Sequence, residues 1–289
     1  MSQPPPPRLV DHDEAGRLIA ADEVTVVDVR TPDEYARLGH VPGARLIPVD
    51  VIAAGPAVLP DDGRPWLVYC EHGVRSRHAA DVLAAAGLAP VLELRHGLSA
   101  WIGPRDFGPA VAEGPASWLL ENIDLLRPGM RVLDVAAGRG RHSLVFATAG
   151  FPVTAIDRDA DRLARLAATA QSMGAPITTL AIDLETGTPD LGDGVYDLVL
   201  VTHYLHRPLM PALVRAVAPG GLLIYETFTR AQAARGRPTN PAFLLEPGEL
   251  PALVAPLEVL RSREGEVEGR DVASVVARAP GRSRQANQE

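Results

Sequence analysis

The chain has 289 residues, 46% of them hydrophobic and 22% charged, which supplies apolar material for two domain cores and excludes a disordered or fibrous protein. All 28 basic residues are Arg, so lysine Schiff-base chemistry and a phosphate-binding loop with lysine are excluded. The single Cys excludes an internal disulfide and multi-cysteine metal sites, and the net charge of -8 argues against nucleic acid as a partner. With no secretory leader and no run of ~18 apolar residues, we expect a cytoplasmic protein that does not span a membrane.

The first hundred residues alternate apolar runs with helix patterns. A helix is expected from the cap Thr31 to Gly39, and another from Ser76 to Gly87. Short runs bounded by Gly, Pro or Asp predict strands at 24–29, 45–49, 66–70 and 91–94. This pattern predicts a small α/β domain with a largely parallel sheet over residues 8–103.

A Gly- and Pro-rich segment, residues 104–116, is the expected linker to a second domain. A helix at 117–126 opens a series that extends to residue 279, and we expect disorder in the tail, 280–289. The series predicts a doubly wound, Rossmann-like α/β fold, in which ligands bind beyond the carboxyl ends of the strands. Its seven predicted strands lie at 130–136, 153–157, 177–183, 196–205, 221–228, 258–266 and 271–278.

Cys70 ends a predicted strand, and the expected helix begins about six residues later, so residues 71–75 would form a tight loop at a helix N-terminus. Backbone N–H groups and the helix dipole stabilise an anion at such a place, and Arg75 adds a fixed positive charge. The loop therefore favours a reactive thiolate at Cys70. The alternative is that this Cys is a small buried hydrophobe.

Five ordered blocks around this loop resemble a rhodanese domain: VVDVR, EY, GHVPGA, CEHGVRS and LRHGLSAW, within residues ~8–103. The resemblance implies that Cys70 carries sulfane sulfur as a persulfide, received from a donor such as thiosulfate, and that Arg75 belongs to the catalytic loop. It also implies that Asp28 and Arg30 are structural. His96 departs from the family pattern, where Gly is common, and we expect only a local effect.

Related phosphatases are the rival interpretation of the same loop. They place five residues between Cys and Arg, whereas four residues separate Cys70 from Arg75. The smaller loop suits sulfur better than a phosphate group. Glu71 also puts a negative charge where a phosphate monoester would sit.

The second domain begins with a strand, RVLDVA, followed by the glycine loop AGRG, which allows close backbone approach to a nucleotide-like ligand. Asp157 ends the next predicted strand and is placed for both ribose hydroxyls, while Asp183 ends the third and is placed for an adenine amine. A dinucleotide is the competitor, but its fingerprint needs three glycines where this chain has Ala136, Gly138 and Arg141.

The blocks VLDVAAGRGRHS, AIDRD, AIDLE, YDLVLVTHYLHR and APGGLLIYETF are similar to class I S-adenosylmethionine-dependent methyltransferases, over ~115–279. The segment PTNPAFLLEPGEL resembles the tellurite-resistance type of this family. Ala136 replaces the usual first glycine and is expected to crowd the loop slightly. The resemblance implies a cofactor site, with no metal, formed by Asp134, Ala136, Gly138, Gly140, Asp157, Asp183 and Leu184.

His203, Tyr204 and His206 lie at the end of the fourth predicted strand and are candidates for the substrate side, although a loop His is more often a surface or capping residue. Methyl transfer to a soft anion such as sulfide needs little beyond positioning, so the sequence assigns no base. The leading hypothesis is a methyltransferase for a small sulfur, selenium or tellurium species, fused to a rhodanese domain with sulfurtransferase activity. The alternative is that the rhodanese domain is a non-catalytic persulfide sensor or docking module.

Overall fold

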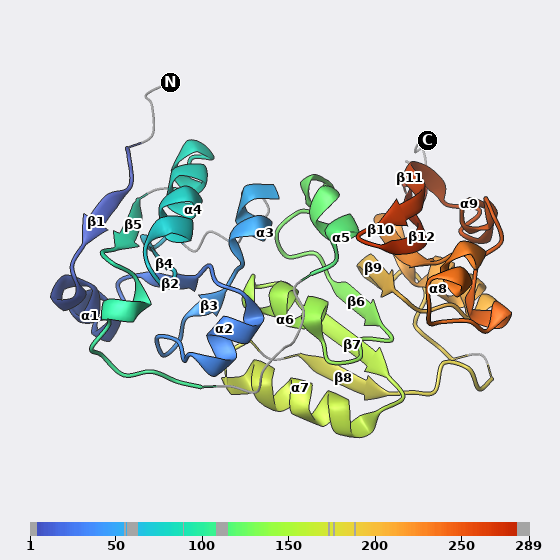
Figure 1. Cartoon of the computed structure of the whole chain (residues 1–289), viewed down its shortest axis with the longest axis horizontal. Helices are drawn as coiled ribbons and strands as arrows, with labels where there is room; N and C mark the ends of the chain where they lie inside the picture. Colours follow the sequence, from blue (N-terminus) through green and yellow to red (C-terminus); the bar gives the residue numbers. More distant parts are fainter. Residues whose placement is uncertain are drawn as a thin grey trace, which may run out of the picture. The chain divides into compact units, whose positions relative to one another are not determined.

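The computed structural model describes residues 5–54, 56, 63–88, 90–107, 115–172, 174–175, 177–187 and 189–281. Two α/β domains follow one another along the chain, each built on its own sheet (Figure 1). Among the described residues, no helix is long and apolar enough to cross a membrane.

The first domain contains a five-stranded sheet with the order β1-β5-β4-β2-β3, and its neighbouring strands pair in parallel. The residues of β2, β4 and β5 are buried along their whole length, as expected where helices cover both faces of a parallel sheet. The strands are β1 (Arg8–Val10), β2 (Thr25–Asp28), β3 (Arg45–Leu46), β4 (Trp66–Tyr69) and β5 (Val91–Leu94).

The helices of this domain connect successive strands. In α2, Thr31 and Glu34 form a reciprocal capping box, which explains why the helix starts directly after Thr31. The helical elements are α1 (His12–Ala20), α2 (Pro32–Arg37), α3 (Val49–Ala54), α4 (Val74–Ala85) and the 3₁₀ helix η2 (Leu98–Ala100).

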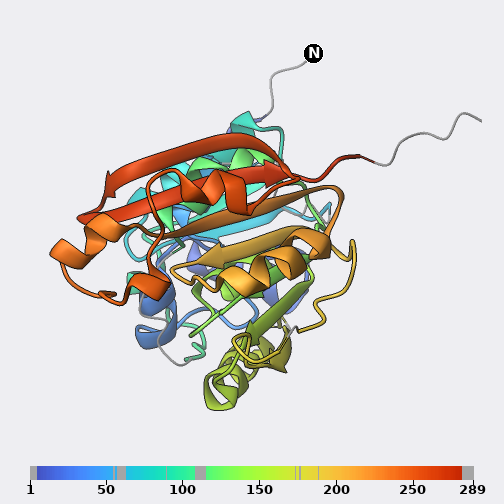
Figure 2. The same ribbon diagram turned by 90° about the vertical axis from the view of Figure 1, so that its right-hand side faces the viewer.

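The second domain contains a seven-stranded mixed sheet with the order β11-β12-β10-β9-β6-β7-β8. The pairs β7–β6, β6–β9 and β9–β10 are parallel, while β12 runs antiparallel to both β10 and β11, which form the long ribbons of Figure 2. The strands are β6 (Val132–Val135), β7 (Val153–Asp157), β8 (Thr178–Ala181), β9 (Tyr196–Thr202), β10 (Val217–Phe228), β11 (Glu258–Val267) and β12 (Arg270–Arg278).

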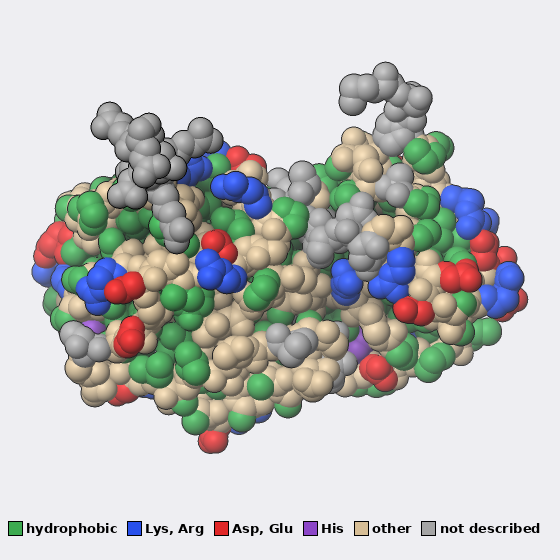
Figure 3. All heavy atoms as spheres, turned by 180° about the vertical axis from the view of Figure 1, so that it is seen from behind, with side chains coloured by type: hydrophobic (Ala, Val, Ile, Leu, Met, Phe, Trp, Pro, Cys, Tyr) green, Lys and Arg blue, Asp and Glu red, His purple; other side chains and the backbone are tan. Residues whose placement is uncertain are grey.

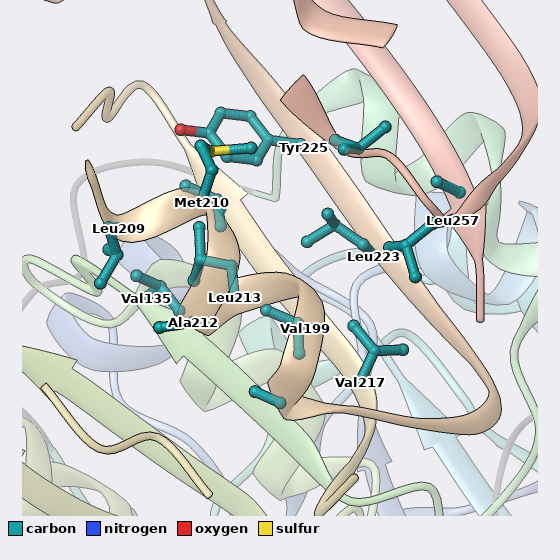
Figure 4. Close-up of a cluster of buried hydrophobic side chains, with 14 of the residues drawn as sticks. Val135, Val199, Leu209, Met210, Ala212, Leu213, Val217, Leu223, Tyr225 and Leu257 are labelled. Carbon is teal, nitrogen blue, oxygen red and sulfur yellow. The ribbon is translucent and has the colours of Figure 1, made fainter. Parts of the chain in front are cut away.

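One apolar cluster holds the central strands of this sheet and α8 together. Figure 4 shows side chains of α8 lying against the sheet. Each fully buried Leu or Val side chain stabilises the fold by ~1.5–3 kcal/mol. The cluster includes Met210, Ala212 and Leu213 of the helix and Val135, Val199 and Leu223 of the sheet. The helical elements are α5 (Ser117–Glu121), η3 (Ile123–Leu125), α6 (Arg141–Thr148), α7 (Ala160–Ser172), η4 (Arg207–Leu209), α8 (Met210–Ala216), η5 (Arg230–Ala234), η6 (Pro241–Phe243) and α9 (Glu249–Leu253).

The predicted fold class is confirmed, with two corrections. The short edge strand β1 was not among the expected strands. The helix α4 begins at Val74 instead of Ser76. Gly73, directly before it, has a left-handed backbone, φ +91°, that turns the chain into the helix two residues earlier than expected. Most of the expected linker, residues 108–114, and most of the expected disordered tail, residues 282–289, lie outside the described residues.

The chain divides into two compact units: Met1–Gly129, Arg139–Pro152 and Ala164–Thr178 form one, while Met130–Gly138, Val153–Leu163 and Thr179–Glu289 form the other.

On the face drawn in Figure 3, Arg side chains alternate with Asp and Glu side chains among the described residues.

Candidate functional sites

Cys70 follows β4 directly and lies at the N-terminus of α4. Its side chain is buried, and the backbone N–H of Gly73 donates a hydrogen bond to Sγ at 3.1 Å. The thiol in turn donates to Ser76 Oγ at 3.5 Å. The sulfur therefore faces a backbone donor and the positive end of a twelve-residue helix, which together favour a negatively charged sulfur.

Gly97 packs closely against the backbone of the Cys70 loop. A Cβ at this position would lie 2.4 Å from the Cys70 carbonyl oxygen and 2.7 Å from that of Glu71, so only glycine fits. The backbone N–H groups of Leu98 and Ser99 donate to these two carbonyls at 2.8 and 2.9 Å. The preceding residue, His96, has φ +62°, a backbone conformation that favours glycine.

Arg75 lies in the first turn of α4 instead of in the loop, which corrects the expected loop boundary. Its guanidinium donates two hydrogen bonds to the Glu34 carboxylate, at 2.6 and 2.7 Å. This hydrogen-bonded pairing lowers the pKa of Glu34 to about 2. The positive charge of Arg75 is thus shared with a carboxylate of α2 before any substrate arrives.

Asp28 and Arg30 are both fully buried and paired, at 2.7 Å between Asp28 Oδ2 and an Arg30 nitrogen. Arg30 also donates to the Gly39 carbonyl at 2.6 Å and to Glu71 Oε2 at 2.7 Å. This placement agrees with a structural role for the pair. The single positive charge of Arg30 is thus shared between the Asp28 and Glu71 carboxylates.

A pocket of about 210 Å³ lies at the carboxyl ends of the strands in the second domain. Four of the predicted cofactor-site residues, Ala136, Asp157, Asp183 and Leu184, line it together with one substrate-side candidate, Tyr204. Sequence reasoning missed the remaining lining residues, Arg158, Arg162, Ile182 and Glu185. Arg158 and Glu185 lie one and two residues after a predicted acid, so adjacency was the available signal.

Backbone donors fix the carboxylates of this pocket. Asp157 Oδ2 accepts a hydrogen bond from Gly138 N at 2.8 Å, and its Oδ1 accepts one from Asp159 N at 2.9 Å. Asp183 Oδ1 accepts from Glu185 N at 3.0 Å. Each oxygen keeps a second lone pair, so a fixed carboxylate can still receive a ligand hydroxyl or amine.

The small residues of the glycine loop meet different spatial requirements. Within the described part of the chain, only the Ala136 carbonyl oxygen lies near the missing Cβ of Gly138 (φ +60°), at 4.0 Å, so this face is open to a ligand. A Cβ on Gly140 would lie 2.3 Å from Leu166 Cδ1, so that glycine serves packing. Ala136 itself has φ +54°, where glycine is favoured, and Asp134 is buried within β6.

The three substrate-side candidates separate in the structure. Among the described residues, the pocket lining includes Tyr204 but neither His203 nor His206. Tyr204 Oη is buried and has no hydrogen-bond partner among the described residues. Burial, followed by the charges of Glu185 and Asp183, raises the pKa of Tyr204 to about 12.

His203 stacks on Phe228, with ring centroids 4.7 Å apart, and His206 precedes η4. No group of three or more His, Cys, Asp or Glu side chains suited to a metal ion is found in the part of the chain that the structure describes.

Comparison with known proteins identifies both domains. Residues 11–103 match the rhodanese-like domain family, and residues 132–221 match a methyltransferase domain family. A sulfurtransferase of Allochromatium vinosum is 39% identical over 85 residues, which cover 29% of this chain and 78% of that protein. The thiosulfate sulfurtransferase GlpE of Pseudomonas paraeruginosa is 36% identical over 106 residues, covering 35% of this chain and 91% of that protein.

The crystal structure of TehB from Haemophilus influenzae superposes with a TM-score of 0.42 and 24% identity, covering 52% of this chain and 57% of that one.

Proposed function

This chain belongs to the rhodanese family through its first domain and carries a methyltransferase domain after it, and we propose that it methylates a small molecule with S-adenosylmethionine while Cys70 carries sulfane sulfur. In this proposal, residues 8–103 form the sulfurtransferase domain and residues 117–279 form the methyltransferase domain. A reducing compartment such as the cytoplasm would keep Cys70 available as a thiol.

In the sulfur step, the Cys70 thiolate attacks the outer sulfur of a donor such as thiosulfate. A new S–S bond forms at Cys70, the donor S–S bond breaks, and sulfite leaves with the electron pair. The N–H group of Gly73 and the N-terminus of α4 stabilise the anionic sulfur before and after transfer. Arg75 would give up its ion pair with Glu34 and bind the anionic sulfur donor instead.

The residues that line the pocket of the second domain support S-adenosylmethionine as its ligand. Asp157 would accept the ribose hydroxyls and Asp183 the adenine amine, while Ile182 and Leu184 supply apolar wall. The open face of Gly138 would allow close approach of the ligand. When bound, the cofactor supplies an electrophilic methyl group.

The methyl acceptor is proposed to be a small sulfur, selenium or tellurium species, because the fused first domain supplies sulfur. The alternative proposal is that the first domain senses persulfide or docks a partner, without turnover. Catalytic coupling requires the Cys70 sulfur for product formation, whereas a sensor or docking role does not.

The observation that carries the cofactor assignment is the convergence of Asp157 and Asp183 on one pocket beside Gly138. In the full chain, we expect Asp157→Ala to weaken S-adenosylmethionine binding by about 1.5–3 kcal/mol, because a charge-assisted pair of hydroxyl contacts is lost. Isothermal titration calorimetry measures this change, with Asp161→Ala, on an exposed position of α7, as the matched control. Unchanged binding in Asp157→Ala, or tighter binding of NAD, would contradict the assignment.

A further inference from the structure

The charged side chains around the Cys70 loop carry more negative than positive charge. Within the part of the chain that the structure describes, ion pairs and side-chain hydrogen bonds link four carboxylates and three guanidiniums to this loop or to one another. With the loop histidine counted as neutral, this set has one net negative charge before a thiolate forms. Its members are Asp28, Glu34, Glu71, Glu93, Arg30, Arg75 and Arg77, and the histidine is His72.

Each guanidinium of this set already has a carboxylate partner. Arg30 is fully buried and lies 2.7 Å from an oxygen of Asp28 and 2.7 Å from an oxygen of Glu71. Arg77 pairs with Glu93, whose side chain is buried and also accepts a hydrogen bond from Ser76 Oγ at 3.4 Å. An anionic molecule that approaches the sulfur therefore has to compete with carboxylates that are already in place.

Arg75 is a cation of this set that is both partly exposed and close to the sulfur. Its side chain is 35% exposed, whereas that of Arg30 is fully buried. The hydrogen bonds with Glu34 raise the pKa of Arg75, and the charge of a Cys70 thiolate raises it further, so the guanidinium lies within electrostatic reach of the sulfur. A donor bound at Cys70 therefore gains from Arg75 to the extent that Glu34 releases it.

The Glu34 carboxylate is held by more than Arg75. Its Oε2 accepts hydrogen bonds from the Thr31 backbone N–H at 3.1 Å and from Thr31 Oγ1 at 3.0 Å, as part of the capping box of α2. Arg75 donates one hydrogen bond to each oxygen, at 2.7 Å to Oε2 and 2.6 Å to Oε1. Because the helix cap keeps the carboxylate in place, a donor has to draw Arg75 away from a fixed competitor.

We propose that Glu34 is a specificity-determining residue of the sulfur site, because it competes with anionic donors for Arg75. The site then favours a sulfane-sulfur donor with a single negative charge, such as a persulfide or an organic thiosulfonate, over dianionic thiosulfate. The proposal rests on the sulfur-carrying role proposed for Cys70 and narrows the class of its donor. At the effective dielectric constant of a protein surface, one additional negative charge on the donor costs about three- to tenfold in rate.

Thiosulfate and methanethiosulfonate are donors that differ by one negative charge. With both, the Cys70 thiolate forms a bond to the outer sulfur, and the bond between that sulfur and the oxidised sulfur breaks. Sulfite or methanesulfinate leaves with the electron pair, and the negative charge of the outer sulfur stays on the Cys70 persulfide. The same bonds form and break in both reactions, so a comparison of the two donors reports on charge.

A kinetic test uses Glu34→Gln, which frees Arg75 and still allows the capping box of α2 through the glutamine amide. With cyanide as the sulfur acceptor, we expect kcat/KM for thiosulfate to rise about three- to tenfold more than kcat/KM for methanethiosulfonate, mainly through a lower KM for thiosulfate. An equal change for both donors, or a loss confined to thiosulfate, overturns the proposal.

An alkylation test does not depend on sulfur transfer. Cys70 is the only cysteine of the chain, so alkylation by iodoacetate and iodoacetamide, which differ by one negative charge, reports on this site alone. Both reagents act on the same thiolate, so the ratio of their rates cancels changes in thiol pKa and in access. We expect Glu34→Gln to raise the iodoacetate-to-iodoacetamide ratio about three- to tenfold and Arg75→Met to lower it.

The double variant with Glu34→Gln and Arg75→Met should return to the wild-type alkylation ratio, because both charges are gone. A double variant that keeps the ratio of Glu34→Gln contradicts the competition for Arg75. Asp33→Asn is the matched control, since it removes a carboxylate of the same helix that pairs with Arg37 instead. It should keep the wild-type ratios for donors and reagents, and thermal unfolding should show that all variants fold.

The two tests separate a failure of this proposal from a failure of the proposed function. If the alkylation ratios change as expected but neither donor is used, the sulfur-carrying role of Cys70 fails while the charge preference of the site stands. An unchanged alkylation ratio in Glu34→Gln overturns the charge preference, whichever donor the protein uses.

Discussion

Gly97 fixes how closely the chain passes behind the Cys70 loop. Because an added Cβ would overlap the carbonyls of Cys70 and Glu71, we expect Gly97→Ala to displace the loop. Thiosulfate-to-cyanide sulfur transfer should fall at least about tenfold, and the free energy of unfolding should fall by about 2 kcal/mol or more.

Gly87 provides the matched control for this substitution. It also has a positive φ, +82°, but no atom of the described residues lies within 4 Å of its missing Cβ. Gly87→Ala should therefore cost only the left-handed penalty, about 1–2 kcal/mol, and leave sulfur transfer intact. Equal sulfur-transfer rates for Gly97→Ala and Gly87→Ala would contradict the role given to the close contact.

Ala136 occupies a left-handed backbone position, φ +54°, in the glycine loop. Ala136→Gly should raise the free energy of unfolding by about 0.5–1 kcal/mol, since relief of the left-handed penalty exceeds the extra entropy of glycine in the unfolded chain. Urea denaturation measures the change. The adjacent Ala137, which lacks a positive φ, is the control, and Ala137→Gly should lower the free energy of unfolding. If Ala136→Gly also lowered it, the backbone at Ala136 would not be strained.

The Glu34–Arg75 ion pair ties α2 to α4, two elements that are separate in the sequence. Because the folded-state pKa of Glu34, about 2, lies below its ordinary value of 4.5, the pair stabilises the fold above pH 4.5. That contribution should be lost as the pH falls from 4.5 toward 2. Solvent exposure keeps it small, on the order of 1 kcal/mol.

Glu34→Gln tests this pH dependence and still allows the capping box at the start of α2. Urea denaturation should show the variant less stable than wild type at neutral pH, with the difference shrinking in acid. The same substitution in an Arg75→Met background should have little further effect, because the partner is already absent. A difference that is constant from neutral to acid pH would exclude the ion pair as its source.

At the level of elements, the sequence predicted those whose signals are local. Apolar runs identified β2, β4 and β5, and the Thr31 cap identified α2. The three-residue β1 carries too short a pattern, and the start of α4 depends on the left-handed backbone of Gly73, which a helix pattern does not encode.

For the candidate sites, the sequence indicated the residues but not their partners. Asp157 and Asp183 could be placed in one site because parallel strands bring their carboxyl ends to the same edge. The pairing of Arg75 with Glu34 joins residues 41 positions apart in the sequence. Such contacts become visible only after the chain has folded.

At the level of the whole molecule, the central question is whether the two domains act on one sulfur atom. Tethering raises the effective concentration of one domain's product at the other to about millimolar for a short flexible linker. A persulfide is labile and free sulfide diffuses away. Fusion would therefore help most if the sulfur carried by Cys70 is the sulfur that is methylated.

The most direct measurement is the initial rate of methyl transfer from labelled S-adenosylmethionine, with thiosulfate and dithiothreitol as the sulfur source and the rate without thiosulfate subtracted. Wild-type protein should form a methylated sulfur product, and Cys70→Ala should lose the thiosulfate-dependent rate, because no persulfide can form. Adding sulfide directly should restore the variant, which shows that its methyltransferase domain is intact. Equal thiosulfate-dependent rates in wild type and Cys70→Ala would contradict the coupled mechanism and favour a sensor or docking role for the first domain.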